Sequence, residues 1–143
     1  MKIHNKNFTE LTLTELYSIL RLRNQIFIVE QECYYEDIDE VDKTAKHIFI
    51  KENEEIAAYI RIYKDKEYHI GRVLVRKDMR NKGYSRKLME YGIDYIFNNL
   101  KADLIEIEAQ DYLKEFYKSL GFTETSDIYL LDNIPHLQMK LKK

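Results

Sequence analysis

Cysteine, proline, glycine and tryptophan are scarce in this 143-residue sequence, which contains one cysteine, one proline, four glycines and no tryptophan. The lone Cys33 cannot form an intrachain disulfide or a multi-cysteine zinc site, so both of these scaffolds are excluded. Proline, glycine and serine are nowhere concentrated, and no linker divides the chain. Residues 1–143 are therefore predicted to form a single domain.

Long hydrophobic runs are missing as well. The apolar stretches are a few residues long, far short of the ~20 that a transmembrane helix needs, and no apolar signal-peptide core follows the first residues. The 23 Lys and Arg residues against 25 Asp and Glu give a net charge of -2, and so no positive field that favours nucleic acid or anionic membranes. We expect a cytoplasmic protein with neither kind of partner.

Hydrophobic periodicity predicts a first helix and three strands in the N-terminal half. Thr12 and Glu15 have capping-box spacing, and apolar residues then recur at helical intervals, so a helix is expected over 13–27. The acidic segment 30–46 is predicted to be a loop or a short helix. For the acidic run 36–42 within it, a solvated loop is favoured over a surface that attracts a cationic amine substrate. Three β-like runs separated by short polar connections follow, at 47–51, 56–63 and 69–75, and indicate an antiparallel meander.

The C-terminal half alternates helices with strands. Helices are expected over 85–100 and 112–120, and strands over 104–109, 122–131 and 136–141. Gly121 stands at the usual C-cap position of the second of these helices. A strand–helix–strand order requires a parallel crossover, so the sheet must be mixed and the fold class α/β or α+β.

The turn between the third strand and the next helix has the composition of an anion site. Arg80 and Lys82 supply positive charge, and Gly83 lets the backbone approach an oxygen atom closely. The first N–H groups of a helix have no intrahelical partner and lie at the positive end of the helix dipole, so they bind phosphate. The alternative is a solvated basic turn with a glycine cap.

Several segments resemble the GNAT superfamily of N-acetyltransferases. The pattern Arg80-x-x-Gly83-x-Ser85 comes five residues after a hydrophobic strand end, and it is followed by the run 104–109, by Gln110 and by the segment 116–122. The stretches 21–33 and 134–139 further resemble the ElaA-like branch of the superfamily. The resemblance spans nearly the whole chain. It implies the GNAT fold, with a mixed, mostly antiparallel sheet of six to seven strands flanked by about four helices.

The resemblance also implies acetyl-CoA as co-substrate and direct transfer of the acetyl group to a primary amine. The turn formed by Arg80, Asn81, Lys82, Gly83, Tyr84 and Ser85 would then bind the pyrophosphate. Val73, Leu74 and Val75 would face the pantetheine arm, and Gln110 would also lie on the cofactor side. Tyr117 falls where many members carry a tyrosine that protonates the departing thiolate. An aromatic residue in such a segment is otherwise a core or rim residue.

The acceptor is a small-molecule or peptide amine of unknown identity, and Glu30, Gln31 and His136 are the candidates to bind it. They gain weight because they lie in the ElaA-like segments. Glu106, Glu108 and His47 are further candidates for the base that deprotonates the amine. The four histidines show no pair at metal-ligand spacing, so no metal is expected.

Two alternative functions stay open at this stage. The chain could be an acyl-CoA-binding module without turnover, or it could resemble acyl-homoserine-lactone synthases, whose early Arg-x-x-x-Phe pattern is echoed by Arg23 and Phe27. The tryptophan expected in that pattern is absent. A homodimer is also plausible.

Overall fold

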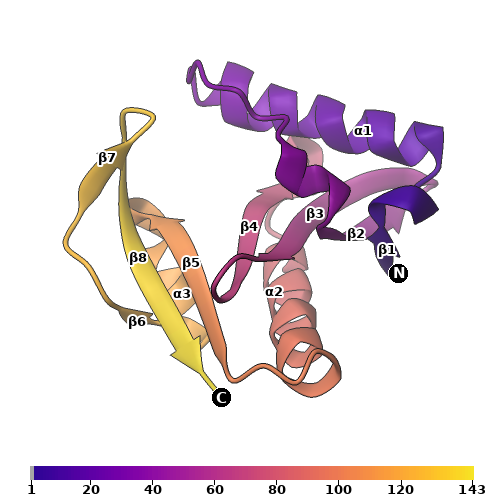
Figure 1. The fold of residues 1–143 in the computed structure, drawn as a ribbon. Helices are drawn as coiled ribbons and strands as arrows, with labels where there is room; N and C mark the ends of the chain where they lie inside the picture. The colour runs from indigo at the N-terminus through magenta and orange to yellow at the C-terminus, as the bar shows by residue number, and fades with distance from the viewer. Residues whose placement is uncertain (1) are drawn as a thin grey trace.

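The computed structural model describes residues 2–143, which form one mixed sheet of eight strands with helices on both faces (Figure 1). The strand order is β1-β2-β3-β4-β5-β8-β6, and β7 also pairs with β8. Every pairing is antiparallel except the pairing of β4 with β5. This confirms the predicted fold class. None of the described helices is long and apolar enough to cross a membrane.

The N-terminal half contains β1 (Ile3–Asn7), α1 (Leu13–Arg23), β2 (Lys46–Glu52), β3 (Glu55–Lys64) and β4 (Tyr68–Val75). Helix α1 begins at the predicted capping box: Thr12 Oγ1 accepts from the Glu15 N–H at 3.0 Å, and Glu15 accepts in turn from the Thr12 N–H at 2.9 Å. The helical backbone continues to Glu30 as a π-helix (Asn24–Glu30). Strand β1 was not predicted, because only one residue of its sequence IHNKN is apolar.

The C-terminal half contains α2 (Tyr84–Asp94), β5 (Leu104–Gln110), α3 (Lys114–Ser119), β6 (Thr123–Glu124), β7 (Tyr129–Leu131) and β8 (Ile134–Lys142). The strand expected over 122–131 is divided into β6 and β7, and the described residues contain three α-helices rather than about four. The structure thus has one strand more than the upper number expected.

Successive side chains of the central strands point to opposite faces of the sheet, and an apolar core forms on each face. Ile48, Ile50, Ile60 and Ile62 pack with α2 and α3, whereas Phe49, Tyr59 and Leu74 pack against α1. A Cβ atom at Gly92 would lie 3.0 Å from the Ile60 side chain, so the glycine lets α2 approach β3 closely. The two cores fix both helical layers relative to the strands that carry the site.

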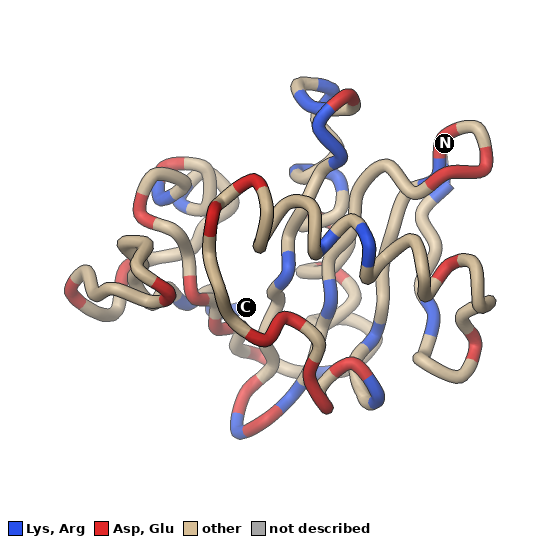
Figure 2. Tube along the Cα trace, turned by 90° about the horizontal axis from the view of Figure 1, so that it is seen from above, with Lys and Arg blue, Asp and Glu red and all other residues tan. Residues whose placement is uncertain are grey.

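The acidic run 36–42, which follows the π-helix, is not a solvated loop, so that expectation was wrong. Asp37 and Asp42 are 7% and 4% exposed, and both bind the fully buried Arg23, through Nε at 2.8 Å and Nη1 at 2.7 Å. Arg61 and Arg72, from β3 and β4, complete the network with contacts to Asp39, Asp42 and Asp37. The segment folds onto the sheet because strand arginines neutralise its carboxylates. Elsewhere, both signs of charge are spread over the trace (Figure 2).

Candidate active site

Strands β4 and β5 part from each other after two residue pairs. They pair in parallel only at Tyr68–Ile105 and His69–Glu106. Beyond that point β4 contains a bulge, where Arg72 adopts a left-handed φ of 49°. A bulge increases local twist and directs the strand away from its neighbour. The C-terminal ends of β4 and β5 therefore diverge (Figure 1), and the Val73–Val75 edge that faces β5 has no strand partner among the described residues.

The turn that follows β4 ends in a helix start with no side-chain cap. Gly83 is the N-cap of α2, with φ 78°, and no side chain caps the helix there. The intrahelical bonds begin with Lys87 N–H to Gly83 O, so the amides of the preceding residues have no intrahelical partner. A Cβ atom at Gly83 would meet nothing within 4 Å, so the space beside this residue at the helix start is open. The geometry suits an anion.

Both cations of this turn face carboxylates. Arg80 donates from Nη2 to Glu30 Oε1 at 2.8 Å and from Nε to the Val75 carbonyl at 3.2 Å. The hydrogen bond from Arg80 lowers the pKa of Glu30. Lys82 Nζ lies 3.8 Å from Glu52, to which the Tyr84 hydroxyl also donates. The sequence predicted Glu30 on the acceptor side, whereas in the structure it contacts Arg80 of the predicted phosphate turn.

Tyr117 lies in the core between α3 and the sheet. The side chain is 6% exposed and packs edge-on against Phe116 and Phe122, with ring centroids at 5.1 and 6.1 Å. Burial raises the pKa of this phenol, so it stays protonated at neutral pH. The residue thus combines the packing role with the protonation state that a general acid requires.

Residues 30–33, at the end of the π-helix, form a segment that we call the strap. It lies across the open end of the split, the gap where β4 and β5 diverge. Glu30 contacts Arg80 as described, Gln31 Oε1 accepts from Gln110 Nε2 at 3.3 Å, and the Cys33 thiol donates to the Asp132 carbonyl at 3.3 Å. The strap thus connects the turn before α2, the end of β5 and the β7–β8 turn.

His136 lies beside this strap because it is opposite Gln110 in the β5–β8 register. Its Nδ1 is 2.7 Å from the Ile134 carbonyl, which assigns the proton to Nδ1 and leaves Nε2 as an acceptor. Gln31 and His136, both predicted for the acceptor pocket, are therefore brought together at the open end with Gln110, which was predicted for the cofactor side.

The other predicted base candidates lie on β2 and β5. His47 is 1% exposed and bridges the Tyr59 hydroxyl and the Asp42 carbonyl at 2.7 and 2.8 Å, in the buried network on the α1 face. Burial lowers its pKa, so it is neutral and structural. Glu106 and Glu108 lie on β5, where Glu106 is 3.3 Å from Lys140 and Glu108 accepts from the Tyr129 hydroxyl at 2.7 Å. No sequence spacing indicates that last contact.

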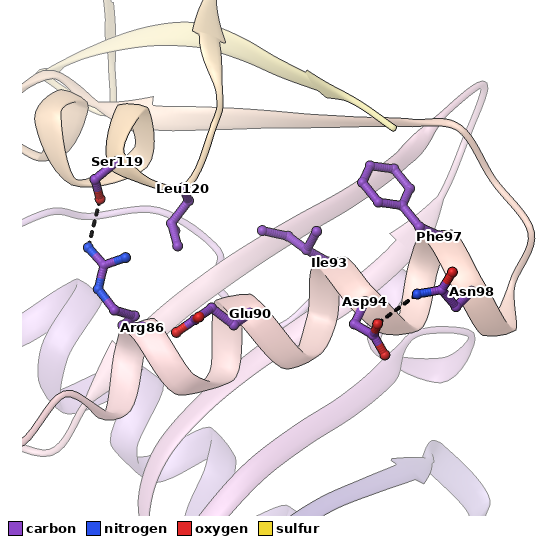
Figure 3. A pocket seen from close by; sticks show the side chains of 8 residues that line it. All are labelled: Arg86, Glu90, Ile93, Asp94, Phe97, Asn98, Ser119 and Leu120. Atoms are coloured by element: carbon purple, nitrogen blue, oxygen red, sulfur yellow. Dashed lines mark hydrogen bonds between the residues drawn. The ribbon is translucent and has the colours of Figure 1, made fainter.

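A groove of about 360 Å³ runs between α2 and α3 (Figure 3). At one end, Arg86 donates to Ser119 Oγ at 2.7 Å and lies over the Phe116 ring. Glu90 and Asp94 line the remainder. The groove begins at Arg86 in the first turn of α2, and the carboxylates of Glu90 and Asp94 make its other end unsuitable for an anion.

The chain is similar to acetyltransferases over nearly its whole length. The model of the family described as "Acetyltransferase (GNAT) domain" matches residues 17–143. Protein ElaA of Escherichia coli K12 is 36% identical over 137 residues, covering 92% of this chain and 90% of ElaA. The crystal structure of E. coli ElaA superposes with a TM-score of 0.94 at 34% identity, covering 99% of this chain and 100% of that chain. An acyl-CoA N-acyltransferase from Pseudomonas aeruginosa gives 0.91 at 29% identity, covering 99% of both chains.

Proposed function

The chain belongs to the GNAT acetyltransferase family, and from that premise we propose that it transfers an acetyl group from acetyl-CoA directly to a primary amine. One observation carries this proposal: an uncapped helix start with an open Gly83 follows a strand that diverges from its parallel neighbour. An anion and an extended chain can bind there side by side.

The residues of the turn and of the split fit acetyl-CoA. The first amides of α2 and the Arg80 guanidinium would bind the pyrophosphate, with Asn81 and Ser85 in the same turn. The free edge of Val73, Leu74 and Val75 would pair with the amide groups of the pantetheine arm as an added strand does. The thioester then lies between β4 and β5, close to the end where Gln110 contacts the strap.

Transfer needs one proton removed from the amine and one given to the leaving thiolate. The amine nitrogen attacks the thioester carbonyl carbon, a C–N bond forms, and the C–S bond breaks. The Tyr117 phenol, which is protonated at neutral pH, would donate its proton to the CoA thiolate. The acceptor enters from the side of Gln31 and His136, because the donor occupies the side of β4 and the helix start.

Two variants test the proposal through separate readouts. Gly83→Val should abolish CoA binding measured by calorimetry, because a β-branched residue is strained at φ 78° and its side chain projects toward the phosphate. Tyr117→Phe should keep CoA affinity and lower thiol release with an amine panel by roughly 10²–10⁴-fold. Arg21→Ala, at an exposed position on α1, controls for a general charge effect.

Each outcome has a distinct meaning. Unchanged CoA binding by Gly83→Val contradicts the phosphate assignment. Near-normal turnover by Tyr117→Phe returns that residue to a packing role. CoA binding without thiol release for every amine would favour an acyl-CoA-binding module.

A further inference from the structure

The open face of β5 carries a carboxylate beside the point where the sheet divides. Ile105, Ile107 and Ala109 point into the core with α2 and α3, so the alternating residues between them face the opposite side. Glu106 still lies within the β4–β5 pairing, where its partner in the strand register is His69. Glu108 is therefore the first residue on this open face beyond the last β4–β5 pair.

Glu108 lines a groove of about 600 Å³ on this face, between the β3–β4 hairpin and strands β5 and β8. The hairpin end and β5 run next to each other in the ribbon view (Figure 1). Besides Glu108, the groove is lined by Tyr63, His69, Glu106, Gln138 and Lys140, among others. An acceptor in this groove reaches the split from the face opposite α2 and α3.

Glu106 and Asp65 of the groove each have a basic partner, whereas Glu108 has none. Glu106 lies 3.3 Å from Lys140, and Asp65 lies 3.0 Å from the His69 imidazole. Glu67 also lines the groove without an ion pair among the described residues, but it lies in the β3–β4 hairpin and not on β5 beside the split. Within residues 2–143, Glu108 has no ion-pair partner. Its one side-chain hydrogen bond there comes from the Tyr129 hydroxyl at 2.7 Å.

Tyr129 is itself held in place. Its ring stacks on His136, with centroids 6.5 Å apart and an interplanar angle of 24°. Burial and the hydrogen bond to Glu108 both raise the pKa of Tyr129, so the hydroxyl remains a donor across the range of neutral pH. A carboxylate whose other oxygen is not bonded is thus oriented by a neutral donor from β7.

We propose, building on the acetyltransferase function above, that Glu108 is the proton acceptor for the amine and that Tyr129 is its positioning residue. The acceptor is an alkylamine that arrives as an ammonium ion, which the uncompensated carboxylate attracts. One ammonium proton passes to the Glu108 carboxylate and then to solvent through the groove. The freed nitrogen lone pair attacks the thioester carbonyl carbon, and the second N–H proton passes to Glu108, which has by then released the first to solvent. The C–S bond breaks, the CoA thiolate takes a proton from Tyr117, and solvent returns a proton to the Tyr117 phenolate.

The other ionisable groups at this end suit the role less well. Glu30 is held by the Arg80 guanidinium on the donor side, and Glu106 is already neutralised by Lys140. His136 faces Glu108 through the Tyr129 ring, and its Nδ1 is bonded to the Ile134 carbonyl. The groups nearest Glu108 are Tyr129 and His136 from β7 and β8. The other titratable groups that line the groove with it come from β3 and β4, from the hairpin between them, and from β5 and β8: Tyr63, Asp65, Lys66, Glu67, His69, Glu106 and Lys140.

The test compares Glu108→Gln with Glu36→Gln, which makes the same change at an exposed position outside the groove, using acetyl-CoA and cadaverine, spermidine or a lysine-containing peptide. Glu108→Gln should bind CoA normally, lower kcat/KM for these amines by roughly 10²–10⁴-fold and lose the rise of rate with pH. Glu36→Gln should keep both the rate, within about threefold, and the pH profile. Hydroxylamine is a weaker base than an alkylamine and is already uncharged near neutral pH, so it should partly rescue Glu108→Gln.

Tyr129→Phe separates positioning from packing. Removing the donor should move the rising limb of the pH–rate profile to higher pH while leaving CoA affinity unchanged, whereas a packing defect would lower the rate equally at every pH. The proposal is overturned by equal rates in Glu108→Gln and the wild type, by the absence of transfer to every alkylamine, or by an equal loss with hydroxylamine. Failure of the wild type to bind CoA would instead overturn the acetyltransferase function.

Discussion

The ion pair between Glu30 and Arg80 predicts that removing an acidic side chain increases the affinity for CoA. Glu30 Oε1 lies 2.8 Å from Arg80 Nη2, at the end of the turn assigned to the pyrophosphate. The phosphate and the Glu30 carboxylate are both anions that compete for one guanidinium. In the free protein the carboxylate must be displaced before Arg80 can bind the phosphate fully, so Glu30→Gln should lower the dissociation constant.

The size of the effect follows from the exposure of the pair. The two side chains are 39% and 35% exposed, so water screens the interaction and its strength lies at about 0.2–1 kcal/mol. Glu30→Gln should therefore increase CoA affinity by about 1.4- to 5-fold. Arg80→Ala should act in the opposite direction and more strongly, by about 1.5–3 kcal/mol or roughly tenfold to a hundredfold, because it removes a hydrogen bond between charged groups.

Calorimetric titration with CoA at constant ionic strength measures both changes. Glu36→Gln is the matched control, because it removes the same charge from an exposed position of the neighbouring segment. In the Arg80→Ala background, Glu30→Gln should have no effect, since the shared partner is gone. The reasoning is refuted if Glu30→Gln weakens CoA binding, or if it strengthens binding equally with and without Arg80.

Two further predictions concern stability. Although burial alone would raise the pKa of Glu15, the Thr12 amide and the ammonium groups of Lys51 and Lys6 lower it to about 2. Glu15 therefore contributes on the order of 1–3 kcal/mol to the free energy of unfolding above pH 4.5, and this contribution is lost as the pH falls toward 2. Glu15→Gln should remove this part of the pH dependence of the unfolding free energy measured in urea. Arg23→Met should cost about 3–5 kcal/mol in the same assay, because it leaves buried carboxylates without their partner; a loss below 1 kcal/mol would contradict this.

Local signals in the sequence were enough for most of the fold. The capping box at Thr12 and Glu15 fixes the start of α1, and alternating apolar residues identify β2 to β5 within one or two residues. Strand β1 is held by pairing with β2 rather than by its own apolar face, and so its polar sequence gives little signal. The division of the last hairpin into β6 and β7 also depends on pairing with β8, which no local pattern encodes.

The acidic segment shows why tertiary partners decide the environment of charged residues. Asp37 and Asp42 look like solvated residues in a run of carboxylates. Their neutralising partners, Arg23, Arg61 and Arg72, lie on three other elements, and spacing along the chain does not reveal that they converge. The same reason hides the Tyr129–Glu108 contact, which joins residues 21 positions apart on strands β7 and β5.

The strap of residues 30–33 connects the two halves of the proposed reaction. Consecutive residues Glu30 and Gln31 contact the donor turn through Arg80 and the end of β5 through Gln110. Cys33 then ties the same segment to the β7–β8 turn, which follows the strand that carries Tyr129. Displacement of Glu30 by a phosphate acts on a segment whose next residues border the acceptor end. Donor binding is therefore expected to change the acceptor pocket, which favours an order in which acetyl-CoA binds before the amine.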